Sequence, residues 1–199
     1  MLTKLKRRVQ EWFTAEAKIL CNIGFTPNKI SILGLFLAFS SALIYTFWKF
    51  NPPLMLIAAS LLLLASGFCD AVDGIMARIH GKVTVFGSFL DSVADRYADA
   101  VTIAGIIFGG LCDPLWGFFA IVGSLLVSYT RAKAELAGVK MESVGLMERA
   151  ERIIIIAFST LIEILVRNAI WWAIVLLAIL TNLTVLQRMR YFYLKTMNK

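Results

Sequence analysis

The chain has 199 residues, of which 59% are hydrophobic and only 17% are charged. Soluble globular domains are about half apolar and about one quarter charged, so this balance excludes an ordinary water-soluble enzyme or a disordered protein. It predicts an all-α integral membrane protein. The 20 Lys and Arg residues outnumber the 13 Asp and Glu residues and give a formal net charge of +7, which a membrane topology has to explain.

The segment 1–22 predicts an amphipathic helix that lies on the membrane surface beside the bundle. Its apolar side includes Leu5 and Trp12, while basic residues such as Arg7 fall mostly elsewhere, and Glu16 interrupts the apolar side. We therefore expect an interfacial segment here rather than a membrane span.

Six apolar segments follow, and we expect each to form a transmembrane helix of a bundle over 28–193. Four of them contain long uncharged runs that approach the ~20 residues needed to cross the hydrocarbon. The third carries four charged residues near one end, and the fifth carries Glu163. The chain 1–199 is accordingly expected to be one membrane domain with helices at 28–49, 53–78, 87–110, 114–137, 148–166 and 169–193.

The basic residues predict the orientation of these helices. If the N-terminus is cytoplasmic, nearly all Lys and Arg residues fall on the inner side, and only Lys49 and Arg167 remain on the outer side. The positive-inside rule then predicts a multi-pass protein of the cell (plasma) membrane with both termini in the cytoplasm. This topology explains the basic excess, so nucleic acid is not expected as a partner.

Paired aspartates are the most unusual feature of the spans. Asp70 and Asp73 are three residues apart on the second helix, and Asp91 and Asp95 are four apart on the third, so each pair shares a helix face. The short link between the helices makes them antiparallel neighbours, which brings all four carboxylates together near the inner surface. An ionised carboxylate in hydrocarbon costs ~3 kcal/mol or more, so these residues are expected to face a cavity or a partner.

Divalent cations would relieve the repulsion among four carboxylates. Oxygen ligands without a nearby His or Cys pair suit one or two Mg²⁺ or Mn²⁺ ions, which can also hold phosphate oxygens. Gly74 and Gly87 leave room for a ligand beside the backbone, and Arg78 can pair with a diphosphate. The alternative is an ion-pair network in which Arg78 and Arg96 neutralise the aspartates. Asp99, one turn beyond Asp95, fits either a contact with acceptor hydroxyls or a hydrogen-bond network.

The two pairs form one continuous motif, Asp70-Ala-Val-Asp73-Gly74-Ile-Met-Ala77-Arg78, then eight residues, then Gly87-Ser-Phe-Leu-Asp91-Ser-Val-Ala-Asp95. This motif resembles the D-x2-D-G-x2-A-R-x8-G-x3-D-x3-D signature of the CDP-alcohol phosphotransferase family. The resemblance implies a six-helix homodimer that transfers a phosphatidyl-type group from a CDP-linked lipid to an alcohol and releases CMP, with Asp95 as the catalytic base. It implies metal ligands at Asp70, Asp73, Asp91 and Asp95, and donor contacts at Asn28, Gly74, Ala77, Arg78, Thr84 and Gly87.

Three basic segments on the inner side bear on the acceptor. They read Ser128-Tyr129-Thr130-Arg131-Ala132-Lys133-Ala134-Glu135, Gly145-Leu146-Met147-Glu148-Arg149-Ala150-Glu151-Arg152 and Gln187-Arg188-Met189-Arg190. The first two resemble the branch of the family that uses inositol phosphate, which implies that the cations bind the acceptor's phosphate. The candidates are Arg131, Lys133, Arg149, Arg152, Arg188 and Arg190.

Three alternatives remain at this point. The basic segments can serve only positive-inside topology and contact with anionic lipids. Glycerol phosphate is an alternative acceptor that would also use several cations. Intramembrane carboxylates also occur in transporters, although these carboxylates are expected near one surface rather than at the midplane.

Overall fold

The computed structural model describes residues 14, 16–17, 19–20, 23–79, 84–141 and 144–197. These residues form six α-helices and one 3-10 turn without any strand, which confirms the predicted all-α class. The interfacial helix predicted at 1–22 lies largely outside the described residues. The elements are α2 (Pro27–Thr46), η1 (Trp48–Phe50), α3 (Pro52–Ile79), α4 (Val85–Phe108), α5 (Pro114–Leu136), α6 (Arg149–Glu163) and α7 (Ala169–Met197).

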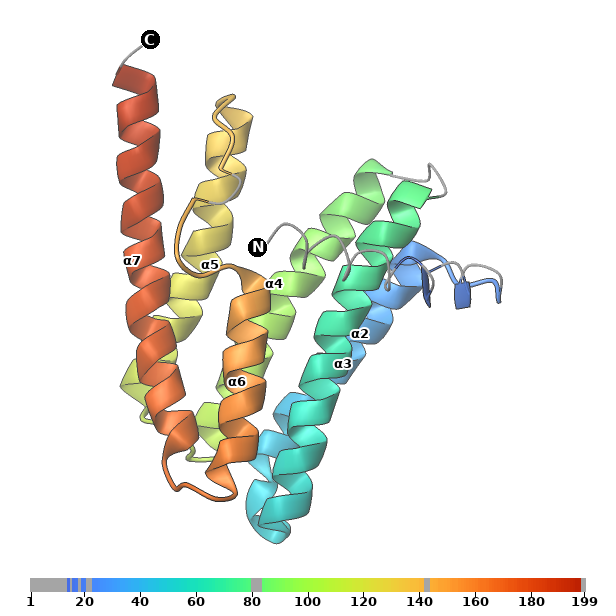
Figure 1. The fold of residues 1–199 in the computed structure, drawn as a ribbon, viewed down its shortest axis with the longest axis vertical. Helices are drawn as coiled ribbons and strands as arrows, with labels where there is room; N and C mark the ends of the chain where they lie inside the picture. Colours follow the sequence, from blue (N-terminus) through green and yellow to red (C-terminus); the bar gives the residue numbers. More distant parts are fainter. Residues whose placement is uncertain are drawn as a thin grey trace.

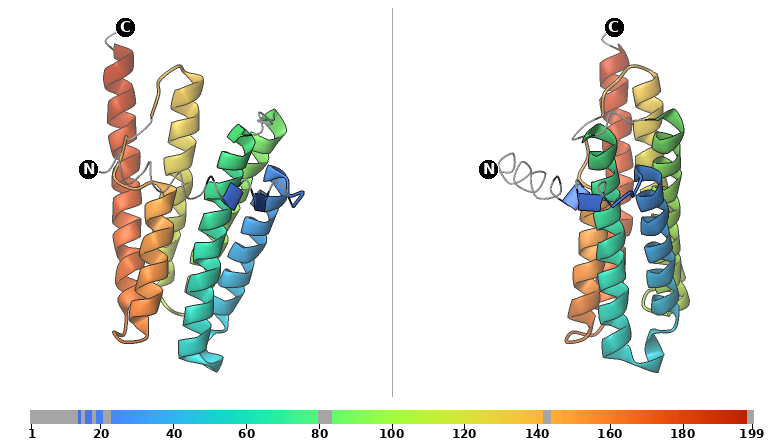
Figure 2. Two further views of the ribbon diagram at one scale, coloured as in Figure 1. Left: turned by 45° about the vertical axis from the view of Figure 1, so that its right-hand side comes forward. Right: turned by 90° about the vertical axis from the view of Figure 1, so that its right-hand side faces the viewer.

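The helices run roughly along one long axis and form two groups. Helices α2, α3 and α4 lie together, as do α5, α6 and α7 (Figures 1 and 2). Packing of α3 against α6 and of α4 against α5 joins the two groups. The start of α2, the end of α3, the start of α4 and the end of α5 lie toward the same end, where Figure 1 also shows the C-terminal end of α7.

Four helices are long and apolar enough to cross a membrane: α2, α3, α5 and α7. Helix α4 has a suitable length of 24 residues but carries the charged residues of the motif. Helix α6 has only 15 residues, which is short for a membrane span. The structure therefore supports a helical membrane protein with four candidate spans.

The first and fifth predicted helices end earlier than expected by the widest margin. Helix α2 ends at Thr46, and the indole N–H of Trp48 in the following turn donates to the carbonyl of Gly109 at 2.9 Å. Helix α6 ends at Glu163, whose carboxylate accepts the backbone N–H groups of Asn168 and Ile170, each at 2.9 Å. These bonds fold the chain back into α7 and shorten the fifth predicted helix.

Helices α2 and α4 pack closely against each other. A Cβ atom on Gly105 would lie 2.4 Å from the backbone oxygen of Ala42, so only glycine permits this approach. A buried hydrogen bond of 2.7 Å joins the hydroxyls of Tyr45 on α2 and Thr160 on α6. The Ser60 hydroxyl on α3 donates to a carbonyl of α6, so polar bonds also tie the two groups together.

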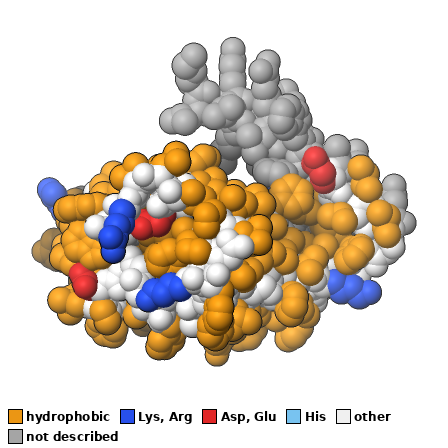
Figure 3. Space-filling view, turned by 90° about the horizontal axis from the view of Figure 1, so that it is seen from below, with side chains coloured by type: hydrophobic (Ala, Val, Ile, Leu, Met, Phe, Trp, Pro, Cys, Tyr) orange, Lys and Arg blue, Asp and Glu red, His pale blue; other side chains and the backbone are white. Residues whose placement is uncertain are grey.

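The outer faces of the bundle carry many large apolar side chains. Phe36, Phe108 and Leu165 are among the most exposed of these residues. Figure 3 shows that the lower end of the molecule is also mostly hydrophobic, with few charged side chains. An apolar surface of this extent is typical of a protein surrounded by lipid.

Candidate active site

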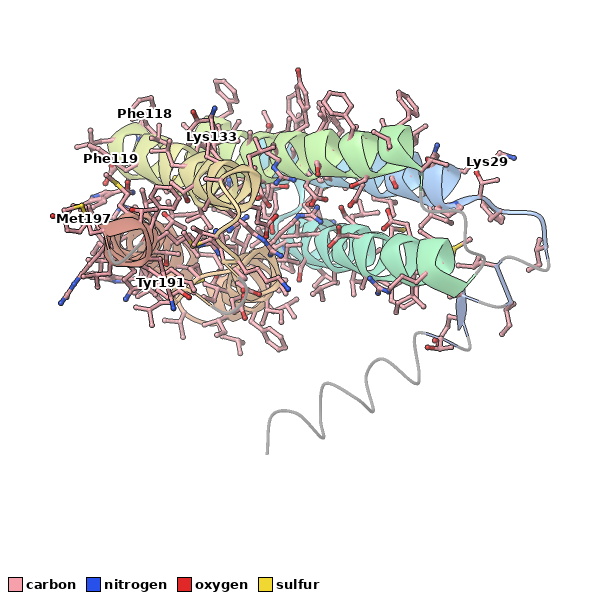
Figure 4. The ribbon with its side chains drawn as sticks, turned by 90° about the horizontal axis from the view of Figure 1, so that it is seen from above. Lys29, Phe118, Phe119, Lys133, Tyr191 and Met197 are labelled. Carbon is pink, nitrogen blue, oxygen red and sulfur yellow. The ribbon has the colours of Figure 1, made fainter. Side chains whose placement is uncertain are left out.

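Three of the four motif aspartates come together between α3 and α4. One carboxylate oxygen from each of Asp70, Asp91 and Asp95 lies within 4.8 Å of the others. Figure 4 shows oxygen atoms gathered between the two helices when the molecule is seen from above. The antiparallel arrangement of α3 and α4 thus brings the two halves of the motif together.

Asp73, the fourth aspartate, is buried and takes a different partner. The hydroxyl of Ser31 on α2 donates to its Oδ2 atom at 2.5 Å. Asp73 lines the same cavity as Asp91 and remains beside the cluster. The sequence analysis missed Ser31, because a lone serine 42 positions before Asp73 carries no local signal for this contact.

A cavity of about 220 Å³ opens beside Asp73 and Asp91. It lies between the first turns of α2 and α4 and the last turns of α3. All six residues predicted to contact the donor line it: Asn28, Gly74, Ala77, Arg78, Thr84 and Gly87. The N-termini of two helices and one arginine favour a negatively charged ligand here, because free backbone N–H groups and the helix dipole attract anions.

The start of α4 is built to bring polar groups close together. Thr84 caps the helix, and its Oγ1 atom accepts the backbone N–H of Gly87 at 2.9 Å. A Cβ atom on Gly87 would lie 2.8 Å from that oxygen and 2.9 Å from Oδ1 of Asn28. A side chain at position 87 would therefore displace the Thr84 hydroxyl and the Asn28 amide at the edge of the cavity.

Arg149 enters the acidic cluster from α6. Its Nη1 atom lies 2.6 Å from both Asp70 and Asp95, and its Nε atom lies 3.7 Å from Asp99. In the alternative ion-pair network, Arg78 and Arg96 would neutralise the aspartates. Arg96 lies 3.6 Å from Asp95, whereas Arg78 lines the 220 Å³ cavity, so Arg149 is the principal counter-charge of the cluster.

A second cavity of about 120 Å³ lies on the other side of Asp95. Four of the six cations predicted to bind the acceptor line it: Arg131, Arg149, Arg152 and Arg188. Lys133 and Arg190 are exposed and do not line it. Figure 4 locates Lys133 on α5. All six residues lie in the same three basic segments of the sequence. The positions of Lys133 and Arg190 around their helices, however, direct these two side chains away from the cavity.

Two arginines of this cavity are almost completely buried. Arg188 is 2% exposed and donates to the backbone carbonyls of Val144 and Val127, so it ties the segment before α6 to α5 and α7. Arg152 is 3% exposed and donates to Asp99. Within the described part of the chain, its Nε and Nη1 atoms have no hydrogen-bond partner.

The cluster has the composition of a site for a hard divalent cation. Its three close ligands are all carboxylate oxygens, the type that Mg²⁺ and Mn²⁺ prefer. Asp91 has no ion-pair partner among the described residues and faces the 220 Å³ cavity, so its charge remains available to a cation shared with a phosphate ligand. These residues fit the predicted cofactor.

Comparison with known proteins identifies the family. The family model of CDP-alcohol phosphatidyltransferases matches residues 25–186, and the chain belongs to this family. The resemblance drawn from the aspartate motif is thereby confirmed, as is the prediction of a transferase rather than a transporter.

Individual relatives cover almost the whole chain. The archaetidylinositol phosphate synthase of Pyrococcus horikoshii is 39% identical over 188 residues, which span 94% of each chain. The structure of Mycobacterium tuberculosis phosphatidylinositol phosphate synthase with CDP-DAG bound is similar with a TM-score of 0.77 and 27% identity, covering 91% of this chain and 93% of that one. The structure of the same M. tuberculosis enzyme with manganese and citrate gives a TM-score of 0.76 at 27% identity, covering 91% and 88%.

Proposed function

We propose that the protein transfers a phosphatidyl-type group, with diacylglycerol or archaeol as the lipid, from a CDP-linked donor to inositol phosphate and releases CMP. Its relatives carry the names of archaetidylinositol and phosphatidylinositol phosphate synthases. The position of two aspartates carries the proposal. Asp91 lines the 220 Å³ cavity, and Asp95, one turn further along α4, lines the 120 Å³ cavity with the arginines.

The 220 Å³ cavity is the proposed donor site. Asn28, Thr84 and Gly87 lie where α2 and α4 begin, and Gly74, Ala77 and Arg78 line it from α3. The helix N-termini and the Arg78 guanidinium favour the diphosphate of a CDP-linked lipid. Asp70, Asp73, Asp91 and Asp95 are the proposed ligands of one or two Mg²⁺ or Mn²⁺ ions. When bound, such ions neutralise the charge of the diphosphate during transfer.

The 120 Å³ cavity is the proposed acceptor site. Arg131, Arg152 and Arg188 present a set of guanidinium groups that suits a phosphate. Arg149 lines the cavity and contacts the aspartates, while Lys133 and Arg190 lie outside it and add to the positive charge of this side of the protein. This cationic lining favours a phosphorylated acceptor over neutral inositol.

Asp95 is the proposed base. An acceptor hydroxyl held beside it attacks the lipid-linked phosphorus of the donor, and its proton passes to the Asp95 carboxylate. A new bond then joins the acceptor oxygen to phosphorus, and the bond from phosphorus to CMP breaks. Because Asp91 and Asp95 line the two cavities from adjacent turns of α4, donor and acceptor would be held one helical turn apart.

The remaining features of the proposal concern the membrane. We place all six helices across the plasma membrane, with both termini and the site facing the cytoplasm, and residues 1–22 on the inner surface. The chain 1–199 then forms one domain, and two copies form a homodimer. The exposed apolar faces and the basic residues near the site support this arrangement.

An assay of CMP release tests the proposal directly. Purified enzyme is supplied with a CDP-linked lipid, Mg²⁺ or Mn²⁺, and one acceptor from a panel of inositol phosphate, glycerol phosphate, inositol and serine. We expect CMP release with inositol phosphate, none after EDTA, and recovery on adding back the metal. We also expect Asp95→Asn to abolish release while keeping the melting temperature of the wild type.

Two outcomes would contradict specific parts of this account. Faster turnover with glycerol phosphate than with inositol phosphate would replace the proposed acceptor. Near-normal turnover by Asp95→Asn would remove Asp95 from the role of base. The Asp113→Asn variant is the matched control. Asp113 lies in the link before α5, far from the site, and accepts a hydrogen bond from the indole of Trp171 on α7.

A further inference from the structure

Asp99 lies one turn beyond Asp95 on α4 and contacts two arginines of α6. Its Oδ2 atom accepts a hydrogen bond from Nη2 of Arg152, and its Oδ1 atom lies 3.7 Å from Nε of Arg149. The Asp99 side chain is only 9% exposed. In the described part of the chain, it is the only carboxylate that forms an ion pair with Arg152.

Asp99 stands behind the proposed acceptor site rather than inside it. Arg149 and Arg152 both line the 120 Å³ cavity, whereas Asp99 does not. Asp99 instead lines a smaller space toward the bundle interior, together with Thr102 and the same two arginines. A molecule in the acceptor cavity would therefore contact the two arginines and not Asp99.

The contact between Asp99 and Arg152 matters because the Arg152 side chain is buried. Asp99 anchors one nitrogen of the guanidinium group, and Nε and Nη1 are buried without a hydrogen-bond partner in the described structure. Buried donors of this kind need an acceptor, and an oxyanion in the adjoining cavity would satisfy them. Because a guanidinium is planar and rigid, fixing one nitrogen also fixes the directions of the others.

Asp99 also shares Arg149 with the acidic cluster. Arg149 contacts Asp70 and Asp95 through Nη1, and approaches Asp99 through Nε. Asp99 thus attracts the guanidinium of Arg149 electrostatically at its Nε atom, without a hydrogen bond, while Asp70 and Asp95 lie at its Nη1 atom. The two arginines keep a defined spacing because one carboxylate contacts both.

We propose that Asp99 is a positioning residue that makes the enzyme selective for a phosphorylated acceptor, by holding Arg152 and Arg149 at the acceptor cavity. This inference rests on the proposed function of the site. It requires only that the acceptor carries a phosphate, and it holds for inositol phosphate or glycerol phosphate.

The test compares Asp99→Asn with the wild type in steady-state kinetics. The amide keeps the shape of the side chain but removes the charge that orients the arginines. We expect the KM for the phosphorylated acceptor to rise about tenfold to a hundredfold, because the guanidinium groups of Arg149 and Arg152 would be displaced from the acceptor's phosphate. The donor KM should stay unchanged, because these arginines do not line the proposed donor cavity. Asp113→Asn is the matched carboxylate-to-amide control and should leave both KM values unchanged.

A double-variant cycle shows whether Asp99 acts through Arg152. If it does, Asp99→Asn combined with Arg152→Gln should raise the acceptor KM no more than Arg152→Gln alone. Asp99→Glu keeps the charge and should restore part of the acceptor affinity, and it also serves if Asp99→Asn does not fold. A merely structural role would instead lower the melting temperature and reduce turnover equally with phosphorylated and unphosphorylated acceptors.

Several results would overturn the inference. These are an unchanged acceptor KM in a folded Asp99→Asn variant, additive effects in the double variant, or a wild-type enzyme that accepts only unphosphorylated alcohols. Turnover of glycerol phosphate but not inositol phosphate would contradict the proposed acceptor alone, and the same variants would then be measured with glycerol phosphate.

Discussion

The four motif aspartates have different surroundings although they belong to one short signature. Asp70 and Asp95 share the Arg149 guanidinium, Asp91 faces the proposed donor cavity, and Asp73 accepts a bond from Ser31. Membership of one sequence signature therefore does not imply equal roles. Asp73 in particular is fixed by a helix that lies outside the motif.

The Ser31→Ala variant tests this residue-scale difference. Losing the bond to Asp73 should lower kcat/KM for the CDP-linked lipid about tenfold, because a hydrogen bond to a charged group contributes about 1.5 kcal/mol or more. Steady-state kinetics with varied donor measures the effect. Ser40→Ala is the matched control, since the Ser40 hydroxyl donates to the Phe36 carbonyl within the same helix and to no other group of the described residues. Equal kinetics for the two variants would show that Ser31 does not position Asp73.

At the residue scale, the sequence predicts well which helix positions come together. It predicts less well which way each side chain points. The motif spacing correctly predicts that Asp70, Asp91 and Asp95 meet, because helix periodicity and a short link determine it. It does not separate Arg152, which is buried, from Lys133, which is exposed, although both lie in basic segments. That distinction depends on which helix packs against each one, and tertiary packing is not visible in a local pattern.

At the scale of elements, the packing of α2 on α4 is the contact that aligns the site. Helix α2 carries Asn28 and Ser31, and α4 carries Asp91 and Asp95, so any shift between the helices changes the donor cavity. Their close approach at Gly105 sets the distance. The sequence predicts both helices, but a glycine among many apolar residues does not reveal its partner.

Gly105→Ala should destabilise the protein and lower its activity together. The added Cβ atom would meet backbone atoms of Ala42 at 2.4–2.8 Å, which cannot move without shifting a helix. We expect a loss of about 1–3 kcal/mol of stability, the usual cost of overpacking. Thermal unfolding in detergent measures it. Gly67→Ala is the control, because its Cβ atom would meet only the Ile153 side chain, at 3.2 Å, and an equal loss in both variants would contradict the close-packing argument.

Helix α6 shows the limit of prediction for whole elements. Its apolar run predicts a span over 148–166, but the helix covers only Arg149–Glu163. The carboxylate of Glu163 binds two backbone N–H groups of the next segment and so closes a turn. A charged residue at the end of an apolar run has several possible uses, and only the fold shows which one applies.

At the scale of the whole molecule, two groups of helices meet along a seam that contains the site. The proposed donor cavity lies within the first group, and the proposed acceptor cavity lies between α4 and the second group. Arg149 and Arg152, from α6, contact the carboxylates of α4 across this seam. In the proposed function, this arrangement brings a lipid-linked donor and a water-soluble acceptor to one set of carboxylates.

The central claim is that the carboxylate cluster binds a divalent cation beside the proposed donor cavity. A titration of Mn²⁺ into the intact enzyme, followed by electron paramagnetic resonance in the presence of CDP, tests this claim most directly. Wild type and Asp113→Asn should bind Mn²⁺ with the same affinity, and adding CDP should strengthen the binding. Asp91→Asn should lose this binding, because its carboxylate lies at both the cluster and the donor cavity. Mn²⁺ binding of equal strength in Asp91→Asn and wild type, with or without CDP, would contradict the account.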